Sequence, residues 1–322
     1  MASAASGTVT TPFPYVVGHK MSLESTHGEV ISVTVTNVYP LTASPVMEVR
    51  IRTEKGFRKA ILKLYDRRFG KKRNSWSETH EKNPHTKQIE DARQNYVRRG
   101  SADMLFDHLK RIDEEEGAGM FQFFYKREEK SELEKVAETE GLICYGNQVD
   151  HDNEVQAYSG LKALQGRCIP RFLASVTLDM PSIPPDLPPI YFEVRGILLQ
   201  KICGFNLSEL LFKLPNNLLA WEEIIQNTVN AVKEINRAGV IHVTLDPDDV
   251  VVARLDEHTF QPFIIDFTNV ALRWLFEGPA GAHEFTSFEA CLNFHQNPLA
   301  IVAVMVPYVE KATGYKPRIN YD

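Results

Sequence analysis

The chain has 322 residues, of which 43% are hydrophobic and 24% are charged, and its formal net charge is −6. This balance is typical of a folded protein with one or two domains, and the negative charge argues against nucleic acid as a partner. Four cysteines lie far apart and lack metal-ligand spacing, which indicates reduced thiols rather than a disulfide framework.

Two segments were considered as membrane or export signals, and neither fits. The first 17 residues have no basic start and no long apolar run, so we expect no secretory signal. The apolar run at 299–309 is too short to span a bilayer and contains Pro307. The sequence therefore predicts a cytoplasmic or nuclear protein without a membrane partner.

The N-terminal part of the chain predicts a tail followed by a sheet. Residues 1–29 are small and polar, and we expect a flexible tail there. The segments 30–38, 46–52 and 57–65 alternate and are rich in β-branched residues, with the turn TEKG between the second and the third. We expect three antiparallel strands.

Residues 67–150 have a different composition, because they are highly charged and poor in β-branched residues. The spacing of apolar residues predicts helices at 85–99 and 101–116. We interpret the whole segment as a charged helical insertion.

A further helix is expected at 152–166, where Asp152 or Asn153 provides an N-cap and Gly166 a stop. The elements expected after it are strands at 171–178 and 191–202, a helix at 221–239 that ends at Gly239, and helices at 287–295 and 297–314.

Lys63 lies in the third expected strand, in the segment AILKLYD. Alternation places it on one face with Ile61 and Tyr65, and an amine among apolar neighbours suggests a charged partner. Glu154 is the candidate, because it shares an apolar helical stripe with Tyr158 and a carboxylate there needs a cation. The alternatives are a surface lysine and a first-turn glutamate near the positive end of a helix dipole.

The segment 239–269 contains a second group of candidate residues. It includes His242-Val-Thr-Leu-Asp-Pro-Asp-Asp249, and a later hydrophobic run ends in Asp266-Phe267. The first motif is similar to the protein kinase catalytic loop H-R-D-L-x-x-x-N, and the second is similar to the D-F-G motif.

These elements and motifs follow the order of the protein kinase fold. Over roughly residues 30–269 the chain resembles the small, divergent kinase-like proteins common in fungi. The resemblance implies an α+β, bilobal, protein kinase-like fold. Its N-lobe would span 30–202, with an antiparallel sheet and the helical insertion at 67–150, and a reduced helical C-lobe would span 203–322.

The resemblance also assigns roles to individual residues. It implies nucleotide contacts from Lys63, Glu154, Gln200 and Ile202, and metal ligands in Asp249 and Asp266. ATP with Mg²⁺ or Mn²⁺ is the implied cofactor.

Several positions depart from the kinase pattern. Thr244 occupies the place of the catalytic base, and its hydroxyl cannot accept a proton as a carboxylate can. Asp246 replaces a lysine and would repel the transferred phosphoryl group. Asp249 replaces an asparagine, which is a mild change because a carboxylate still coordinates a divalent cation. Thr268 replaces the glycine after Asp266-Phe267, so the turn loses conformational freedom.

The nucleotide-covering loop and the C-terminal part also differ. The segment 37–47 has no glycine and contains Pro40 and Pro45, which weakens phosphate binding by backbone amides. Residues 268–322 are fewer than a full kinase C-lobe needs and contain no A-P-E motif.

These observations favour a pseudokinase with weak or no phosphotransfer that acts in nucleotide or protein binding, with an unknown protein as partner. One alternative is an active, divergent ATP-dependent phosphotransferase in which Asp246 or Asp249 acts as a displaced base. The other is a non-catalytic module that binds a metal ion or a protein.

Overall fold

The computed structural model has an α+β fold and divides into two compact units. Unit 1 comprises Met1–His151 and Ala174–Leu198, and unit 2 comprises Asp152–Leu173 and Leu199–Asp322. The residues that the structure describes are 10–54, 56–75, 83–115, 130–180, 183–277 and 285–321.

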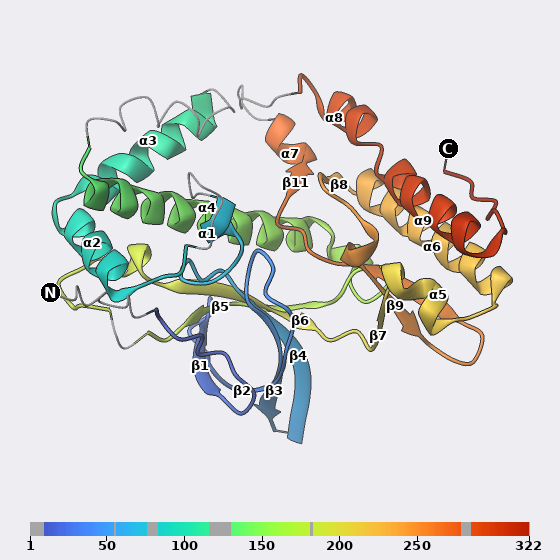
Figure 1. Ribbon diagram of the computed structural model, residues 1–322, viewed down its shortest axis with the longest axis horizontal. Coiled ribbons are helices and arrows are strands. Elements are labelled where there is room, and N and C mark those ends of the chain that lie inside the picture. The colour runs from blue at the N-terminus through green and yellow to red at the C-terminus, as the bar shows by residue number, and fades with distance from the viewer. Residues whose placement is uncertain are drawn as a thin grey trace, which may run out of the picture. The chain divides into compact units, whose positions relative to one another are not determined.

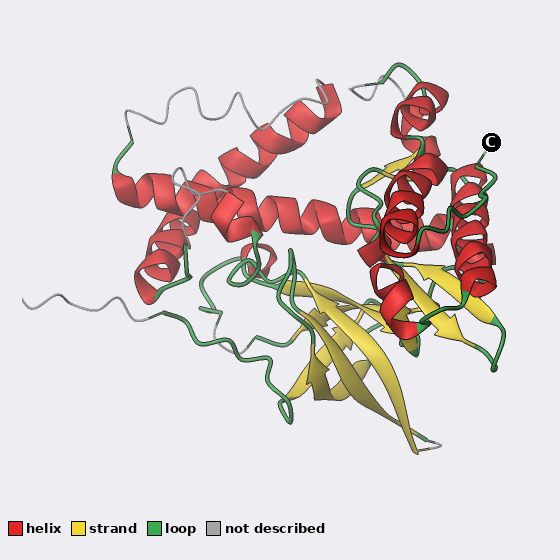
Figure 2. Cartoon of the chain, turned by 45° about the vertical axis from the view of Figure 1, so that its right-hand side comes forward, coloured by secondary structure: helices red, strands yellow, loops and turns green. Residues whose placement is uncertain are grey.

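Unit 1 is built around a closed, six-stranded barrel with strand order β1-β2-β3-β4-β6-β5 (Figures 1 and 2). Closure leaves no unpaired sheet edge. The strands are β1 (Lys20–Ser25), β2 (Val30–Val38), β3 (Val46–Thr53), β4 (Gly56–Leu64), β5 (Phe172–Leu178) and β6 (Val194–Gln200).

The three strands expected at 30–38, 46–52 and 57–65 agree with β2, β3 and β4, which pair antiparallel. Alternate side chains such as Val33, Val49 and Leu62 are buried in the core of the barrel. The period-2 pattern in the sequence therefore reflects a sheet with one buried face.

The expected tail at 1–29 contains a strand. β1 pairs antiparallel with both β2 and β5, and its Leu23 is completely buried. Residues 1–9 lie outside the described residues, so the expected tail is tested only from residue 10 on. The short alternating segment KMSLES has no β-branched residue, and its place in the barrel depends on strand partners supplied by the rest of the fold.

Four helices of the described chain begin in the expected insertion: α1 (Lys72–Ser75), α2 (Lys87–Arg98), α3 (Ser101–Glu115) and α4 (Glu132–Gly160). α2 and α3 correspond to the helices expected at 85–99 and 101–116. The Thr86 side chain caps α2 by accepting from the Ile89 amide at 3.3 Å. Leu105 and Leu109 of α3 pack on Leu142 of α4. Residues 76–82 and 116–129 of the expected insertion lie outside the described part.

The helix expected at 152–166 starts 20 residues earlier, because α4 is one helix of 29 residues that ends at Gly160. Asp152 and Asn153 are in its interior, so neither is its N-cap. Buried polar residues such as Glu138 and Glu140 interrupt its apolar stripe, and this hid the helix from a search for apolar periodicity.

Unit 2 has two small sheets, of strand order β10-β9-β7 and β11-β8. The strands are β7 (Gly204–Asn206), β8 (Val240–His242), β9 (Val250–Arg254), β10 (Phe260–Ile264) and β11 (Val270–Leu272). The helices are α5 (Leu210–Lys213), α6 (Leu218–Arg237), α7 (Arg273–Phe276), α8 (Phe288–His295) and α9 (Asn297–Thr313).

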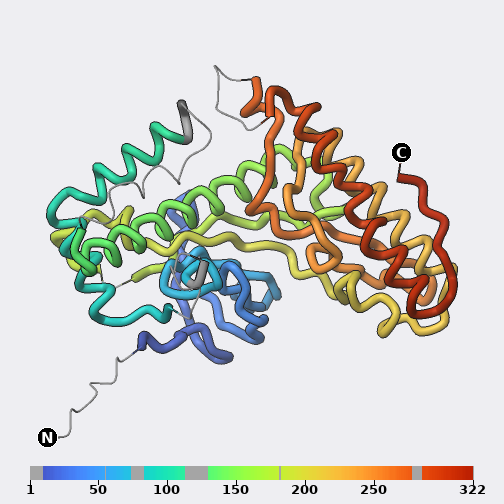
Figure 3. The backbone as a smooth tube through the Cα atoms, turned by 45° about the horizontal axis from the view of Figure 1, so that its top comes forward, coloured from blue at the N-terminus to red at the C-terminus, as the bar shows by residue number. Residues whose placement is uncertain are grey.

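The central helix α6 packs against α9 and β10, and α6 and α9 run side by side (Figure 3). It agrees with the helix expected at 221–239, and Gly239 follows it with φ +88°, a conformation that favours glycine. α8 and α9 agree with the helices expected at 287–295 and 297–314. Among the described residues, no helix combines the length and apolar character that a membrane crossing needs.

Candidate functional site

The residues singled out at 239–269 come together in unit 2, and we call residues 242–249 and 266–268 the loop site. Backbone hydrogen bonds connect residues 242–249 to the two residues that flank 266–268, next to the paired strands β8 and β11. The Val243 amide donates to the Asn269 carbonyl, and the Ile265 amide donates to the Asp249 carbonyl, both at 2.9 Å. These bonds hold the segment around Thr244 next to the segment around Phe267, although the two are about 20 residues apart in the chain.

His242 is buried, and the side chain of Asn297 holds its backbone. Its backbone amide donates to Oδ1 of Asn297 at 3.1 Å, and Nδ2 of Asn297 donates to the His242 carbonyl at 2.6 Å. Nε2 of His242 lies 3.9 Å from Oδ2 of Asp249, and its ring centroid lies 6.0 Å from that of Phe267. Sequence reasoning missed Asn297, whose only signal was its place before a proline at a helix start.

Asp246 and Asp249 form a reciprocal capping pair around a 3-10 turn, Pro247–Asp249. Oδ1 of Asp246 accepts from the Asp248 amide at 2.6 Å, and Oδ2 of Asp249 accepts from the Asp246 amide at 3.1 Å. Both carboxylates therefore hold the backbone of the loop. Thr244, which the kinase resemblance aligns with the catalytic base, is exposed.

Asp266 adopts φ +62°, a left-handed conformation that is uncommon for residues other than glycine. Its Oδ1 accepts from the Thr268 hydroxyl at 2.6 Å and from the Thr268 amide at 3.4 Å. Thr268, which the resemblance aligns with the glycine of the D-F-G motif, thus stabilises the turn through its hydroxyl. Strained backbone of this kind is concentrated at functional sites.

The C-terminal part of α4 holds the same turn. Oε1 of Glu154, which is completely buried, accepts from the Phe267 amide at 3.3 Å, and Nδ2 of Asn153 donates to the Thr268 carbonyl at 3.3 Å. The Tyr158 ring packs edge-on against Phe267 at 5.3 Å between centroids. Burial and the carboxylates of Glu154 and Asp266 raise the pKa of Tyr158 well above its usual value, so the phenol remains protonated at neutral pH.

The resemblance also assigned nucleotide contacts to Lys63, Glu154, Gln200 and Ile202. Lys63 is a buried residue of β4 in unit 1, with Nζ 5.7 Å from the centroid of the Tyr65 ring. Glu154 belongs to unit 2, and its pairing with Lys63 stays a prediction. The backbone amide of Gln200 donates to the Arg171 carbonyl at 2.8 Å. Oε1 of Gln200 accepts from the backbone amide of Arg171 at 3.1 Å. Ile202, two residues on, is half-buried.

Within unit 2 the loop site thus brings together His242, Asp246, Asp249 and Asp266, and Glu154 of α4 holds one of its backbone amides. In the described part of the chain, no three or more His, Cys, Asp or Glu side chains form a group that could hold a metal ion. No family model matches the chain, and no curated protein matches it closely enough to be reported as a relative.

Proposed function

We propose that the chain is a protein kinase-like domain with weak or no phosphotransfer, which acts by binding a nucleotide or a protein. The order of elements supports this proposal: strands β2, β3 and β4, the long helix α4, strands β5 and β6, the helix α6, and then the two segments of the loop site. This is the order of the kinase resemblance.

The observation that carries the proposal is the capping pair of Asp246 and Asp249. A divergent kinase would need one of these carboxylates as a replacement base, because Thr244 has no useful basicity near neutral pH. Each carboxylate instead accepts a backbone amide of the loop itself. A base must reach the acceptor hydroxyl, and side chains committed to the loop backbone are poorly placed to do so.

Nucleotide binding is proposed to be weak or absent for related reasons. Asp266, the proposed metal ligand, uses Oδ1 to hold Thr268. The segment 37–47 offers no glycine for close approach of the backbone to phosphates. If ATP binds, we propose that it contacts Lys63, Glu154, Gln200 and Ile202, with Mg²⁺ or Mn²⁺ on Asp249 and Asp266.

The first experiment measures thermal stability with ATP and Mg²⁺ or Mn²⁺, and phosphoryl transfer from radiolabelled ATP. Lys63→Ala is compared with Lys59→Ala, which changes an exposed lysine on the same strand. Asp266→Asn is compared with Asp256→Asn, in the turn between β9 and β10. We expect background transfer and little stabilisation, whereas nucleotide at 100 times its Kd would stabilise by about 2.7 kcal/mol.

Each alternative gives a different result. Transfer above background that Asp246→Asn or Asp249→Asn abolishes, and Asp256→Asn does not, would establish an active phosphotransferase. Stabilisation by Mn²⁺ or Mg²⁺ without nucleotide, lost in Asp266→Asn, would favour a metal-binding module. Either result would refute the proposal.

A further inference from the structure

Arg93 of α2 is a buried cation without an ion pair in the described part of the chain. The residue is completely buried, and none of its three guanidinium nitrogens donates to a nitrogen or oxygen atom of a described residue. Its Cζ lies 5.6 Å from the centroid of the Tyr191 ring. Burial lowers the pKa of Arg93, because the surroundings oppose its charge. A buried guanidinium in this state needs an anion.

The carboxylates near Arg93 already serve other arginines. Arg67 pairs with Glu90 and, at 2.7 Å, with Glu140, and Arg73 pairs with the other oxygen of Glu140, also at 2.7 Å. The charge of Glu140 favours the Arg93 cation, but the charge of Arg67 opposes it. In this cluster of five side chains, three guanidinium groups therefore share two carboxylates.

Cys144 of α4 lies next to the unpaired guanidinium group. Nη1 of Arg93 is 3.3 Å from the point that a Cβ on Gly141 would occupy, and Cys144 follows Gly141 by one helical turn, on the same face of α4. Tyr191 contacts Arg93 through its ring and accepts from Sγ of Cys144 through its carbonyl at 3.6 Å. Among the groups that favour the Arg93 cation, the charge that Cys144 can carry has a larger effect than Glu140.

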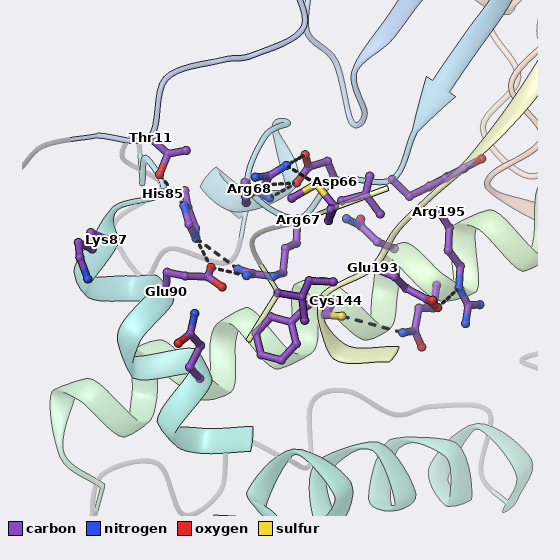
Figure 4. Close-up of a pocket in the computed structure, with 18 residues that line it drawn as sticks. Thr11, Asp66, Arg67, Arg68, His85, Lys87, Glu90, Cys144, Glu193 and Arg195 are labelled. Atoms are coloured by element: carbon purple, nitrogen blue, oxygen red, sulfur yellow. Dashed lines mark hydrogen bonds and ion pairs between the residues drawn. The ribbon is translucent and has the colours of Figure 1, made fainter. Parts of the chain in front are cut away.

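Cys144 also lines a cavity of about 240 Å³ in unit 1, and Arg67 lines it too (Figure 4). The cavity could hold several molecules of the size of water, so a reagent as small as hydrogen peroxide fits in it. A negative charge on Cys144 favours the cation of Arg67 as well as that of Arg93. Cationic neighbours make a thiol more reactive, and Cys144 has two of them.

We propose that Cys144 is an oxidation site, at which hydrogen peroxide converts the thiol to an oxyacid whose anion pairs with Arg93. The sulfur attacks one peroxide oxygen, so that an S–O bond forms and the O–O bond breaks. The other oxygen leaves as hydroxide and takes the thiol proton to become water. Sulfur thereby loses the two electrons that the peroxide gains.

A second molecule of peroxide oxidises the sulfenic acid to a sulfinic acid in the same way, and this acid gives its proton to water. The oxygens of the anion accept N–H groups of the guanidinium, which supplies the negative charge that the cluster lacks. The site is independent of the kinase-like proposal, because it uses none of the loop-site residues.

The first test compares the cysteines of the reduced full chain. After timed exposure to hydrogen peroxide and quenching with catalase, the chain is denatured and the remaining thiols are alkylated. Peptide mass spectrometry then gives the thiol loss and the sulfinic acid at each position. Cys168 and Cys291 are buried like Cys144 and therefore control for burial. We expect Cys144 to be oxidised at least about tenfold faster than either, which is the effect of one hydrogen bond to a charged group. A rate no faster than theirs would overturn the proposal.

Variants of Arg93 test the role of the cation. Arg93→Met removes the charge and keeps an unbranched side chain, and it should slow oxidation of Cys144 about tenfold. Arg93→Lys keeps the charge and should retain most of the rate. The control is Arg99→Met at the end of α2, where the side chain is 70% exposed and no change is expected. An unchanged rate in Arg93→Met would overturn the proposal.

Thermal unfolding gives a second readout, which also tests the proposal if Arg93→Met does not fold. Oxidation adds polar oxygens at a buried position, and these destabilise the fold unless a cation pairs with them. We expect the oxidised chain to melt at no lower temperature than the reduced chain. Cys144→Ala, treated in the same way, reports the effect of the other three cysteines. A lower melting temperature after oxidation of the unaltered chain, but not of Cys144→Ala, would show that Arg93 does not pair with the oxidised sulfur.

Discussion

Glu140 offers the sharpest test of how unit 1 is stabilised. This residue of α4 is 1% exposed, and its oxygens lie 2.7 Å from Nη1 of Arg67 and 2.7 Å from Nη2 of Arg73. Removing one partner of a buried ion pair costs about 3–5 kcal/mol. Because glutamine keeps one acceptor oxygen, we expect Glu140→Gln to lower the free energy of unfolding by about 3 kcal/mol.

The effect should depend on pH. Burial opposes ionisation of Glu140, but the guanidinium groups of Arg67 and Arg73 outweigh it and lower the pKa of the carboxyl group. A carboxyl group whose pKa is lower in the folded than in the unfolded protein stabilises the fold. This stabilisation is fully present above the pKa of the unfolded state, and it is lost as the pH falls through the pKa of the folded state. The difference in the free energy of unfolding between the unaltered chain and Glu140→Gln should therefore be largest at neutral pH and smaller under acid conditions.

The assay is urea denaturation followed by circular dichroism, with hydrogen exchange to locate the change in α2 and α4. The matched control is Glu132→Gln in the first turn of α4, where the side chain is 86% exposed and little change is expected. Two results would contradict this expectation: Glu140→Gln lowers the free energy of unfolding by less than about 1 kcal/mol, or its difference from the unaltered chain does not change with pH. Either result would show that the buried ion pairs do not stabilise the unit in this way.

Three further predictions concern unit 2. Asn297→Ala removes both hydrogen bonds to the His242 backbone, so denaturation should show a loss of about 2–4 kcal/mol; an unchanged midpoint would contradict this. Gly204→Ala would place a Cβ 2.2 Å from the Val252 carbonyl oxygen, so β7 must shift, and we expect a lower melting temperature and faster hydrogen exchange in β7 and β9. Burial and the charge of Glu234 raise the pKa of Cys168 to about 11. Alkylation of this thiol, followed by mass spectrometry, should therefore be slow at pH 8 and become faster toward pH 11. Fast alkylation at pH 8 would refute this prediction.

Local patterns predicted several elements correctly. The alternation of β2, β3 and β4 and the apolar stripe of α6 arise from neighbours within one element, and each leaves its period in the sequence. The capping pair of Asp246 and Asp249 had a local signal too, an aspartate before a proline with an acid three residues later, but we assigned these residues to chemistry instead.

Long-range features left no such signal. β1 was missed because its partners β2 and β5 decide whether a short polar segment becomes a strand. The start of α4 was missed because its buried glutamates resemble surface residues until their basic partners are known, which are Lys130 for Glu138 and Arg67 for Glu140.

The sequence by itself determined the α+β class, strands β2 to β6 and helices α2, α3, α6, α8 and α9, and it singled out residues at 242–249 and 266–268. These depend on interactions between residues close in the chain, such as turns, caps and the period of apolar side chains. The tertiary structure decided which polar groups are buried and what they contact. Arg67 and Glu140 are 73 residues apart, and only the folded chain gives each a partner that offsets the loss of hydration.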